Sequence, residues 1–129
     1  MRDQIVKEAK RVVIKVGSRL VASKGRGLNG ERIDQLAAEL AGLKALGKEI
    51  VMVSSGAIVC GIEKLGLKEY PKTLPLKQAA AAVGQSRLMW AYEKAFEKEG
   101  QKVAQVLLTS EDLANRAMNP PCANIQRRC

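Results

Sequence analysis

The sequence predicts an α/β protein, a parallel sheet with helices on both faces, and two observations lead to this fold class. Short apolar runs rich in β-branched residues alternate along the chain with longer segments of helical periodicity, a pattern typical of parallel sheets. The 129 residues, 47% hydrophobic and 27% charged, have the length and balance of one compact globular domain. Right-handed crossovers would bring the carboxyl ends of the strands to one edge, where ligands bind.

The first buried strand is predicted at Arg11–Val16, where the sequence reads RVVIKV. A loop with Gly and Ser residues follows over residues 17–29. Asn29 is a suitable N-cap for the next helix, and Gly47 is suited to end it. One stripe of that helix is apolar and is expected to face the core: Ile33, Leu36, Ala37, Leu40, Leu43 and Leu46.

The second buried strand is predicted at Glu49–Ser54, with the sequence EIVMVS. Ser55 and Gly56 then turn the chain directly into an apolar helix at Ala57–Leu65. Gly66 is placed to stop that helix.

The remaining pattern predicts a long helix over residues 76–99, which Gly100 ends, and a third strand over residues 102–108. Thr109 is a suitable N-cap for a further helix, with Asp112 at the capping-box position. Strands and helices therefore alternate along the whole sequence, as a parallel sheet requires.

Composition excludes several classes of protein. The net charge of +9 favours anionic partners such as nucleotides, phosphates, carboxylates or nucleic acid. The absence of histidine excludes Ser-His-Asp and Cys-His catalysis and histidine metal sites. Cys60, Cys122 and Cys129 form no CxxC pair, which argues against a disulfide scaffold or a zinc site. No apolar run reaches the roughly 18 residues of a membrane span, so we expect a soluble cytoplasmic protein. We assign no metal-ligating residue in the sequence.

Lys15 is the first candidate functional residue. A lysine in an apolar strand is costly unless its ammonium group finds a partner or reaches water. Lys15 lies at the carboxyl end of the first strand, two residues before Gly17. Its charge can neutralise a phosphate, which Gly17 would let approach the backbone closely. A strand-end lysine that extends to water explains the same pattern, and the spacing alone does not decide between the two.

The second candidate site joins the second strand to a helix N-terminus, at Ser54, Ser55, Gly56 and Ala57. Unpaired amides at such a terminus, together with the helix dipole, bind anions, and Ser55 adds a hydroxyl donor. An ordinary N-cap serine without a ligand is the alternative. The functional interpretation gains weight because both candidate sites fall on the same predicted edge of the sheet.

Gly25, Gly27 and Gly30 match the pattern G-x-G-x-x-G. A dinucleotide fingerprint requires its first glycine directly after a strand and an acidic residue at the end of the next strand. Neither condition is met here, so we reject that interpretation and expect a hairpin or lid. The phosphate-binding P-loop motif G-x-x-x-x-G-K-[ST] is absent as well.

Gly84 marks a third candidate within the predicted helix at 76–99. Because a helical glycine costs about 1 kcal/mol relative to alanine, Gly84 indicates close helix packing or a nearby ligand. The polar residues Gln85, Ser86 and Arg87 face either a substrate, a partner subunit or solvent.

Four segments, in this order and spacing, resemble the glutamate 5-kinases of the amino-acid kinase family. They are VIKVGS (13–18), VSSGAI (53–58), KQAAAAVGQSRL (77–88) and QVLLT (105–109). The resemblance covers residues 9–116 and implies the incomplete N-terminal half of the amino-acid kinase fold.

The resemblance also implies an activity: ATP-dependent phosphorylation of the side-chain carboxylate of L-glutamate to glutamyl 5-phosphate, the first step of proline synthesis. ATP would act with Mg²⁺, and full-length members are typically homo-oligomers. By motif, Lys15 corresponds to the catalytic lysine that contacts the ATP phosphates, and Ser55 to the serine that binds glutamate. Four neighbouring positions would supply backbone amides: Gly17 and Ser18 toward ATP, and Gly56 and Ala57 toward the substrate.

The resemblance ends near residue 116, so we expect a family-like part at 1–116 and a divergent tail at 117–129. Pro120 and Pro121 break the helix that the family continues there, and we interpret the tail as the product of a frameshift or a mispredicted end. Later family segments carry a substrate loop, a second phosphate-binding lysine and the nucleotide half of the sheet. We therefore expect negligible kinase activity from this chain alone.

Three alternatives stay open at this point. The chain resembles other amino-acid kinases, such as acetylglutamate kinase and aspartokinase, although VSSGAI favours glutamate 5-kinase. A small basic nucleic-acid-binding domain would fit the charge, but the aromatic content of 3% provides few stacking residues. A nonfunctional truncation product is the third possibility.

Overall fold

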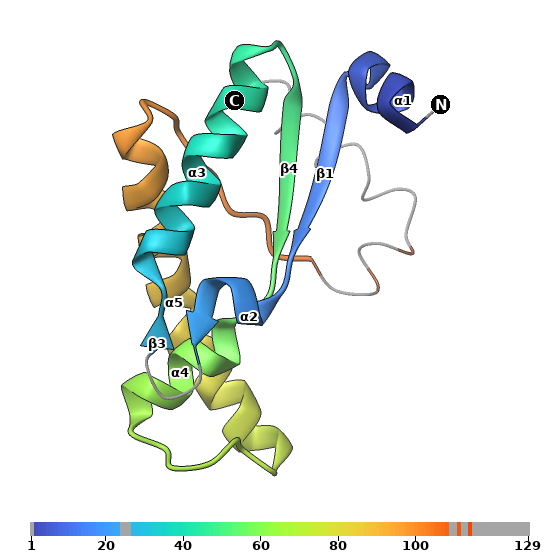
Figure 1. Ribbon diagram of the computed structural model, residues 1–129. Helices are drawn as coiled ribbons and strands as arrows, with labels where there is room; N and C mark the ends of the chain where they lie inside the picture. The colour runs from blue at the N-terminus through green and yellow to red at the C-terminus, as the bar shows by residue number, and fades with distance from the viewer. Residues whose placement is uncertain (1, 24–26, 109–110, 112–113, 115–129) are drawn as a thin grey trace.

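The computed structural model describes residues 2–23, 27–108, 111 and 114. Strands β1 (Arg11–Val16) and β4 (Glu49–Ser54) pair in parallel, in a register that joins Lys15 to Val53 and Val16 to Ser54. Figure 1 shows the two strands side by side, with their carboxyl ends together. The positions of the two predicted strands and the mixed α/β class are thus confirmed. The expected burial of both strands is wrong, because exposed residues recur along β1 and β4 has exposed residues of its own.

Helix α3 (Gly30–Ala45) begins and ends where the sequence indicates. The Asn29 side chain accepts a hydrogen bond from the Arg32 amide at 3.1 Å, as an N-cap should. Gly47 adopts a positive φ of 78°, which a glycine reaches without a steric penalty. The last residue of the expected apolar stripe, Leu46, is nevertheless 75% exposed. It lies at the C-cap, where the chain has already left the helix and turns away from the core.

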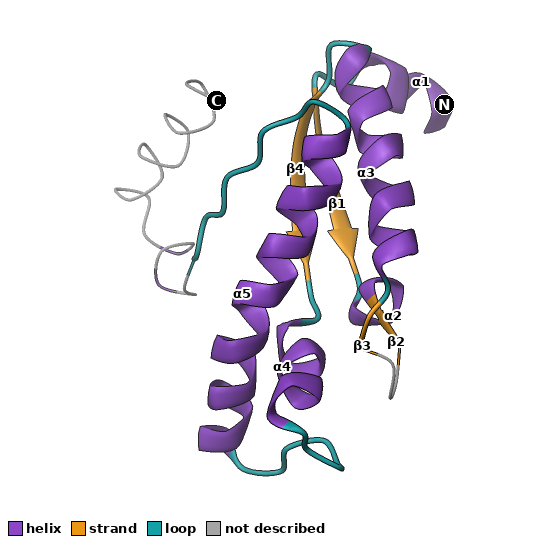
Figure 2. Cartoon of the chain, turned by 90° about the vertical axis from the view of Figure 1, so that its left-hand side faces the viewer, coloured by secondary structure: helices purple, strands orange, loops and turns teal. Residues whose placement is uncertain are grey.

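Helices α4 (Ala57–Leu65) and α5 (Leu74–Lys98) follow β4. Gly66 caps α4 in the left-handed conformation, as predicted. Helix α5 begins two residues earlier than the pattern indicates, because Pro75 is accommodated in its first turn, where a missing N–H costs nothing. In Figure 2, α4 lies against the first half of α5, at the end of the molecule beyond the strands.

Helices α3 and α5 pack on the same side of the strand pair (Figure 1). The inward-facing residues of the strands, Ile14, Ile50 and Met52, pack against this core. Cys60 is fully buried, as expected from its apolar segment. The buried core comprises Val16, Val21, Ile33, Ala37, Leu40, Cys60, Leu88, Tyr92, Ala95 and Phe96.

Within the described residues, α3 and α5 cover one face of the strand pair and the opposite face is exposed, where helices on both faces were expected. Exposed and half-buried residues alternate along β1, and Val13 is 65% exposed on the outer face. On β4, Val53 is 52% exposed beside Lys15, its register partner. The face that carries Lys15 is therefore not the face that carries the core.

The predicted loop at 17–29 contains more structure than expected. A short helix, α2 (Ser18–Val21), is followed by an antiparallel hairpin of β2 (Ala22–Ser23) and β3 (Gly27–Leu28). The hairpin expected from the glycines is confirmed, although Gly25 lies outside the described residues. A further short helix, α1 (Arg2–Glu8), precedes β1 and was not predicted.

The third predicted strand, at 102–108, is wrong. These residues have no regular structure, and within the described part the sheets are the pairs β1–β4 and β2–β3. A strand is stabilised by pairing and by burial of its side chains. This segment has neither, since Leu107 is 75% and Leu108 49% exposed. The predicted cap at Thr109 and Asp112 and the tail at 117–129 lie outside the described residues.

Candidate functional site

The carboxyl ends of β1 and β4 bring the two predicted sites together. Beyond β1 the chain passes through Gly17 into α2, and beyond β4 it passes through Ser55 and Gly56 into α4. The Ser55 amide donates to the Val16 carbonyl at 2.9 Å, which extends the ladder by one residue. A Cβ atom on Gly56 would lie 3.8 Å from the Ser18 Cα atom, so the two strand–helix turns are in contact.

Lys15 and Ser55 belong to the same open face. Lys15 pairs with Val53 in the ladder, and Ser55 lies two residues further along, so the alternation of strand residues places it on that side. Both residues are exposed. Among the described residues none forms an ion pair with Lys15, so its ammonium group faces solvent beside an apolar surface and can receive an anion.

Two helix N-termini meet at this edge without side-chain caps. Gly17 is the N-cap of α2 and Gly56 the N-cap of α4, and neither terminus has a side-chain cap hydrogen bond. The first amides of a helix lack intrahelical acceptors. In α4, which has 9 residues, the helix dipole also favours a negative charge beside them. Ser18 and Ala57, the first helical residues, contribute such amides.

Gly56 occupies a position that only glycine fits well. Its φ is +120°, and an added Cβ atom would lie 2.9 Å from Cγ2 of Val21. A side chain would therefore meet both backbone strain and a steric clash. The conformation brings the start of α4 against α2.

Gly84 is explained by helix packing rather than by a ligand. An added Cβ atom on Gly84 would lie 1.7 Å from the Ala57 carbonyl oxygen. A Cβ atom on Gly61 would lie 1.7 Å from the Ala80 carbonyl oxygen. The two glycines thus let α4 and α5 cross with their backbones in contact. Because Ala57 begins α4, the crossing holds the helix N-terminus at the candidate site.

Arg87 is engaged away from the strand edge. Its Nη1 atom lies 3.1 Å from Oε2 of Glu63 on α4. The Glu63 carboxylate in turn packs against Gly27 of the hairpin, where a Cβ atom would clash with it. This ion pair between α4 and α5 is none of the three alternatives that the sequence suggested for Arg87.

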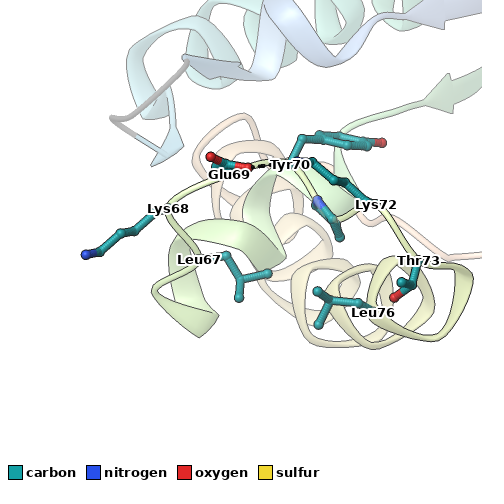
Figure 3. Close-up of a pocket in the computed structure, with 8 residues that line it drawn as sticks. Leu67, Lys68, Glu69, Tyr70, Lys72, Thr73 and Leu76 are labelled. Atoms are coloured by element: carbon teal, nitrogen blue, oxygen red, sulfur yellow. Dashed lines mark ion pairs between the residues drawn. The ribbon is translucent and has the colours of Figure 1, made fainter.

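Two shallow hollows lie away from the strand edge. One, of about 240 Å³, is lined by Leu28, Ser86, Arg87 and Trp90. The other, of about 350 Å³, lies under the loop between α4 and α5 (Figure 3). There Lys72 and Glu69 form an exposed ion pair of 3.3 Å above an apolar floor that includes Leu67 and Leu76. Ser86 and Arg87, which belong to the third candidate of the sequence, line the first hollow, whereas no residue of the strand edge lines either one.

Sequence reasoning missed a buried hydroxyl pair behind the edge. Tyr92 of α5 is 2% exposed, and its Oη atom lies 2.6 Å from Oγ of Ser54, the last residue of β4. Burial raises the pKa of the Tyr92 hydroxyl above its usual value, and the bond with Ser54 offsets only part of that rise. The four-residue spacing of Gly84, Leu88 and Tyr92 could have revealed this pair. It places Tyr92 on a buried stripe of the helix, where a tyrosine hydroxyl needs a polar partner.

The described part contains no group of three His, Cys, Asp or Glu side chains that could hold a metal ion. Across the same residues, no helix combines the length and the apolar character needed to cross a membrane. The edge itself presents a lysine, hydroxyls and amides, a donor set that suits anions rather than cations.

Comparison with known proteins identifies the family. Residues 10–127 match the amino acid kinase family. Glutamate 5-kinases of Geobacter metallireducens and Citrifermentans bemidjiense are both 54% identical over 116 residues, and that of Azoarcus sp. is 53% identical over 116 residues. Each match covers 90% of this chain, which spans about 31% of the length of the relative. The chain therefore belongs to the amino acid kinase family.

Proposed function

We propose that this chain forms the front edge of the active site of an ATP-dependent glutamate 5-kinase. The observation that carries the proposal is the convergence of Lys15, Ser55 and two uncapped helix N-termini on one open edge. The glutamate 5-kinase relatives support the choice of substrate. The reaction transfers the γ-phosphoryl group of ATP to the side-chain carboxylate of L-glutamate.

Each residue has a role that its position supports. Lys15 neutralises charge on the transferred phosphoryl group, with the amides of Gly17 and Ser18 toward ATP. Ser55 donates its hydroxyl to the glutamate substrate, and the amides of Gly56 and Ala57 face its carboxylate charge. The carboxylate attacks phosphorus directly, so the chain needs to position the reactants and neutralise charge, without a covalent intermediate.

Magnesium accompanies ATP in this chemistry and would offset phosphate charge when bound. The described residues do not fit a magnesium site, because no carboxylate group lies among the residues of the candidate edge. We therefore assign no residue of this chain to the metal. We propose that the full-length enzyme, rather than this chain alone, forms homo-oligomers.

We further propose that the 129-residue chain alone has negligible kinase activity. Phosphoryl transfer is fastest where water is excluded, whereas the face that carries Lys15 is open, with Val13 65% and Val53 52% exposed. Formation of acyl phosphate, trapped as the hydroxamate, tests this directly. Turnover by the chain at the rate of a full-length glutamate 5-kinase would refute the proposal of inactivity.

Calorimetric titration of the full chain tests the substrate. We expect L-glutamate to bind more tightly than N-acetylglutamate or L-aspartate. Ser55→Ala should weaken glutamate binding about tenfold or more, because it removes a hydrogen bond to a charged group. Thr73→Val is the control, because it removes an exposed hydroxyl that makes no side-chain cap hydrogen bond at the start of α5. Equal binding by Ser55→Ala and wild type would contradict the role of Ser55.

The phosphate side is tested with Mg-ATP. Lys15→Met should abolish nucleotide binding, whereas Lys44→Met, which removes the same charge from exposed α3, should not. A chimera supplies the test of activity. Replacing the aligned part of the Geobacter metallireducens enzyme with residues 1–116 of this chain should preserve glutamyl phosphate formation. A folded but inactive chimera would contradict the assignment.

A further inference from the structure

Three groups behind the candidate edge form a connected set of hydrogen bonds, which we term the hydroxyl relay: the Tyr92 hydroxyl, the Ser54 hydroxyl and the Ser55 carbonyl. The Tyr92 and Ser54 oxygens are 2.6 Å apart, and Ser54 Oγ donates to the Ser55 carbonyl at 3.0 Å. A serine hydroxyl has one proton. Both bonds therefore form together when Tyr92 donates to Ser54 and Ser54 donates to Ser55.

The relay determines the orientation of one peptide unit. In a trans peptide, the carbonyl and the following N–H point in opposite directions, and the structure contains no cis peptide among its described residues. Holding the Ser55 carbonyl toward Ser54 and Tyr92 therefore turns the Gly56 N–H away from the core. The peptide on the other side of Ser55 is fixed as well, because its amide donates to the Val16 carbonyl at 2.9 Å.

We propose that Tyr92 is a positioning residue that orients the Ser55–Gly56 peptide, so that the Gly56 amide is presented to a carboxylate of the bound amino acid. This inference rests on the proposed function and deepens it. Tyr92 touches no substrate itself, because it is 2% exposed and lies behind β4. Its ring contributes to the core, whereas its hydroxyl acts on the peptide. Tyr92→Phe separates the two roles.

The raised pKa of Tyr92 agrees with this role. Burial disfavours the tyrosinate, so the hydroxyl keeps its proton and stays a donor at neutral pH. The Ser54 hydroxyl donates its own proton to the Ser55 carbonyl, so its oxygen can only accept a hydrogen bond from Tyr92.

The first experiment measures geometry without a ligand, on the full 129-residue chain. Residual dipolar couplings report the direction of the Gly56 N–H bond relative to the amides of α5. We expect Tyr92→Phe to change the Gly56 coupling and leave those of α5 unchanged. Tyr70→Phe is the matched control, because it removes the same hydroxyl from a ring that is 55% exposed. An unchanged Gly56 coupling in Tyr92→Phe would overturn the inference.

The second experiment measures L-glutamate affinity by calorimetry. Tyr92→Phe should weaken binding about three- to tenfold, the range of one hydrogen bond, whereas Tyr70→Phe should bind like wild type. Ser54→Ala breaks the relay without altering the ring and should give the same loss. Ser54→Thr, which keeps the hydroxyl, should restore binding. Wild-type affinity in both Tyr92→Phe and Ser54→Ala would overturn the inference.

The two experiments distinguish failure of the inference from failure of the proposed function. If wild type does not bind L-glutamate, the proposed function fails for this chain, and the dipolar couplings alone support or overturn the role of Tyr92. If Tyr92→Phe does not fold, Ser54→Ala replaces it in both measurements. A loss of affinity in Ser54→Ala with an unmoved Gly56 N–H bond would contradict positioning.

Discussion

The candidate edge and the crossing of α4 and α5 are adjacent, yet they are built on opposite principles. At the edge, Lys15 and Ser55 are exposed on an open face. At the crossing, Gly61 and Gly84 bring two helix backbones so close that no Cβ atom fits. The contrast teaches that the side chains expected to bind ligands contribute little to stability, while residues without side chains hold them in place. Substitutions in the two regions should therefore separate function from stability.

The largest effect is expected at the crossing. Gly84→Ala places a methyl group 1.7 Å from the Ala57 carbonyl oxygen, so α4 and α5 must separate. We expect a loss of about 3 kcal/mol or more in the free energy of unfolding, measured by urea denaturation. Gly42→Ala is the control, because nothing lies within 4 Å of its added Cβ atom in α3. Its higher helix propensity should stabilise the chain by up to about 1 kcal/mol. Equal denaturation midpoints for Gly84→Ala and wild type would refute the packing argument.

A smaller effect is expected where the two regions meet. Gly56→Ala introduces a residue with a φ of +120° and a contact of 2.9 Å with the Val21 side chain. Strain of this kind costs about 1–3 kcal/mol, and the same change should disturb glutamate binding. Gly17→Ala should unfold close to wild type, because its φ is −76° and its added Cβ atom meets nothing within 4 Å. If Gly17→Ala were destabilised more than Gly56→Ala, backbone strain and crowding at Gly56 would not explain the need for glycine there.

The buried groups beneath the edge predict a loss of stability in alkaline solution. Burial raises the pKa of the Cys60 thiol above its usual 9.0, and the charge of Arg87 offsets part of this rise. Burial likewise raises the pKa of Tyr92 above 10.0. A raised pKa in the folded state means that the unfolded chain releases its proton first. The stabilising contribution is therefore complete below these values and lost as the pH rises through the folded-state pKa.

Urea denaturation at a series of pH values from 7 upward checks this prediction. The free energy of unfolding should decline above pH 9, and Cys60→Ala should make that decline shallower, whatever its effect at neutral pH. A slope that is unchanged in Cys60→Ala would show that the thiol does not contribute to the decline.

The smallest effect on stability is expected at the exposed side chains of the candidate edge. Lys15→Met and Ser55→Ala remove no buried contact, so we expect changes within about 0.5 kcal/mol in the free energy of unfolding. The same variants should show the large binding losses described above. A decrease of more than about 2 kcal/mol in the free energy of unfolding of either variant would be on the order of a buried-core substitution. It would contradict the view that the edge residues contribute little to stability.

The sequence allowed the local features to be predicted, since each depends on neighbours in the chain. Lys15 at a strand end, Asn29 as an N-cap and Gly66 as a helix end are visible in a few residues. The resemblance then assigned roles to Lys15 and Ser55, and those roles stay proposals. The position of Gly84 inside a predicted helix already indicated close packing or a nearby ligand, because a helical glycine is costly.

The features that were missed depend on contacts between distant segments. Ser54 and Tyr92 are 38 positions apart, and no local pattern connects them. Gly61 lies in an ordinary apolar helix, and only the crossing with Ala80 explains it. The segment 102–108 has a sequence suited to a strand, but strand formation requires a pairing partner, which local propensity cannot supply. Leu46 was misplaced because the helix ended one residue before it.

Gly84 and Tyr92 lie eight positions apart on α5, which corresponds to about 12 Å along the axis and somewhat more than two turns. The first contacts the start of α4 at Ala57, and the second contacts the end of β4 at Ser54. Helix α5 thus fixes the distance between the end of β4 and the start of α4, the two elements that flank Ser55. Inserting or deleting a single residue between them would rotate one contact by about 100° relative to the other. This stretch should tolerate changes of residue far better than changes of length.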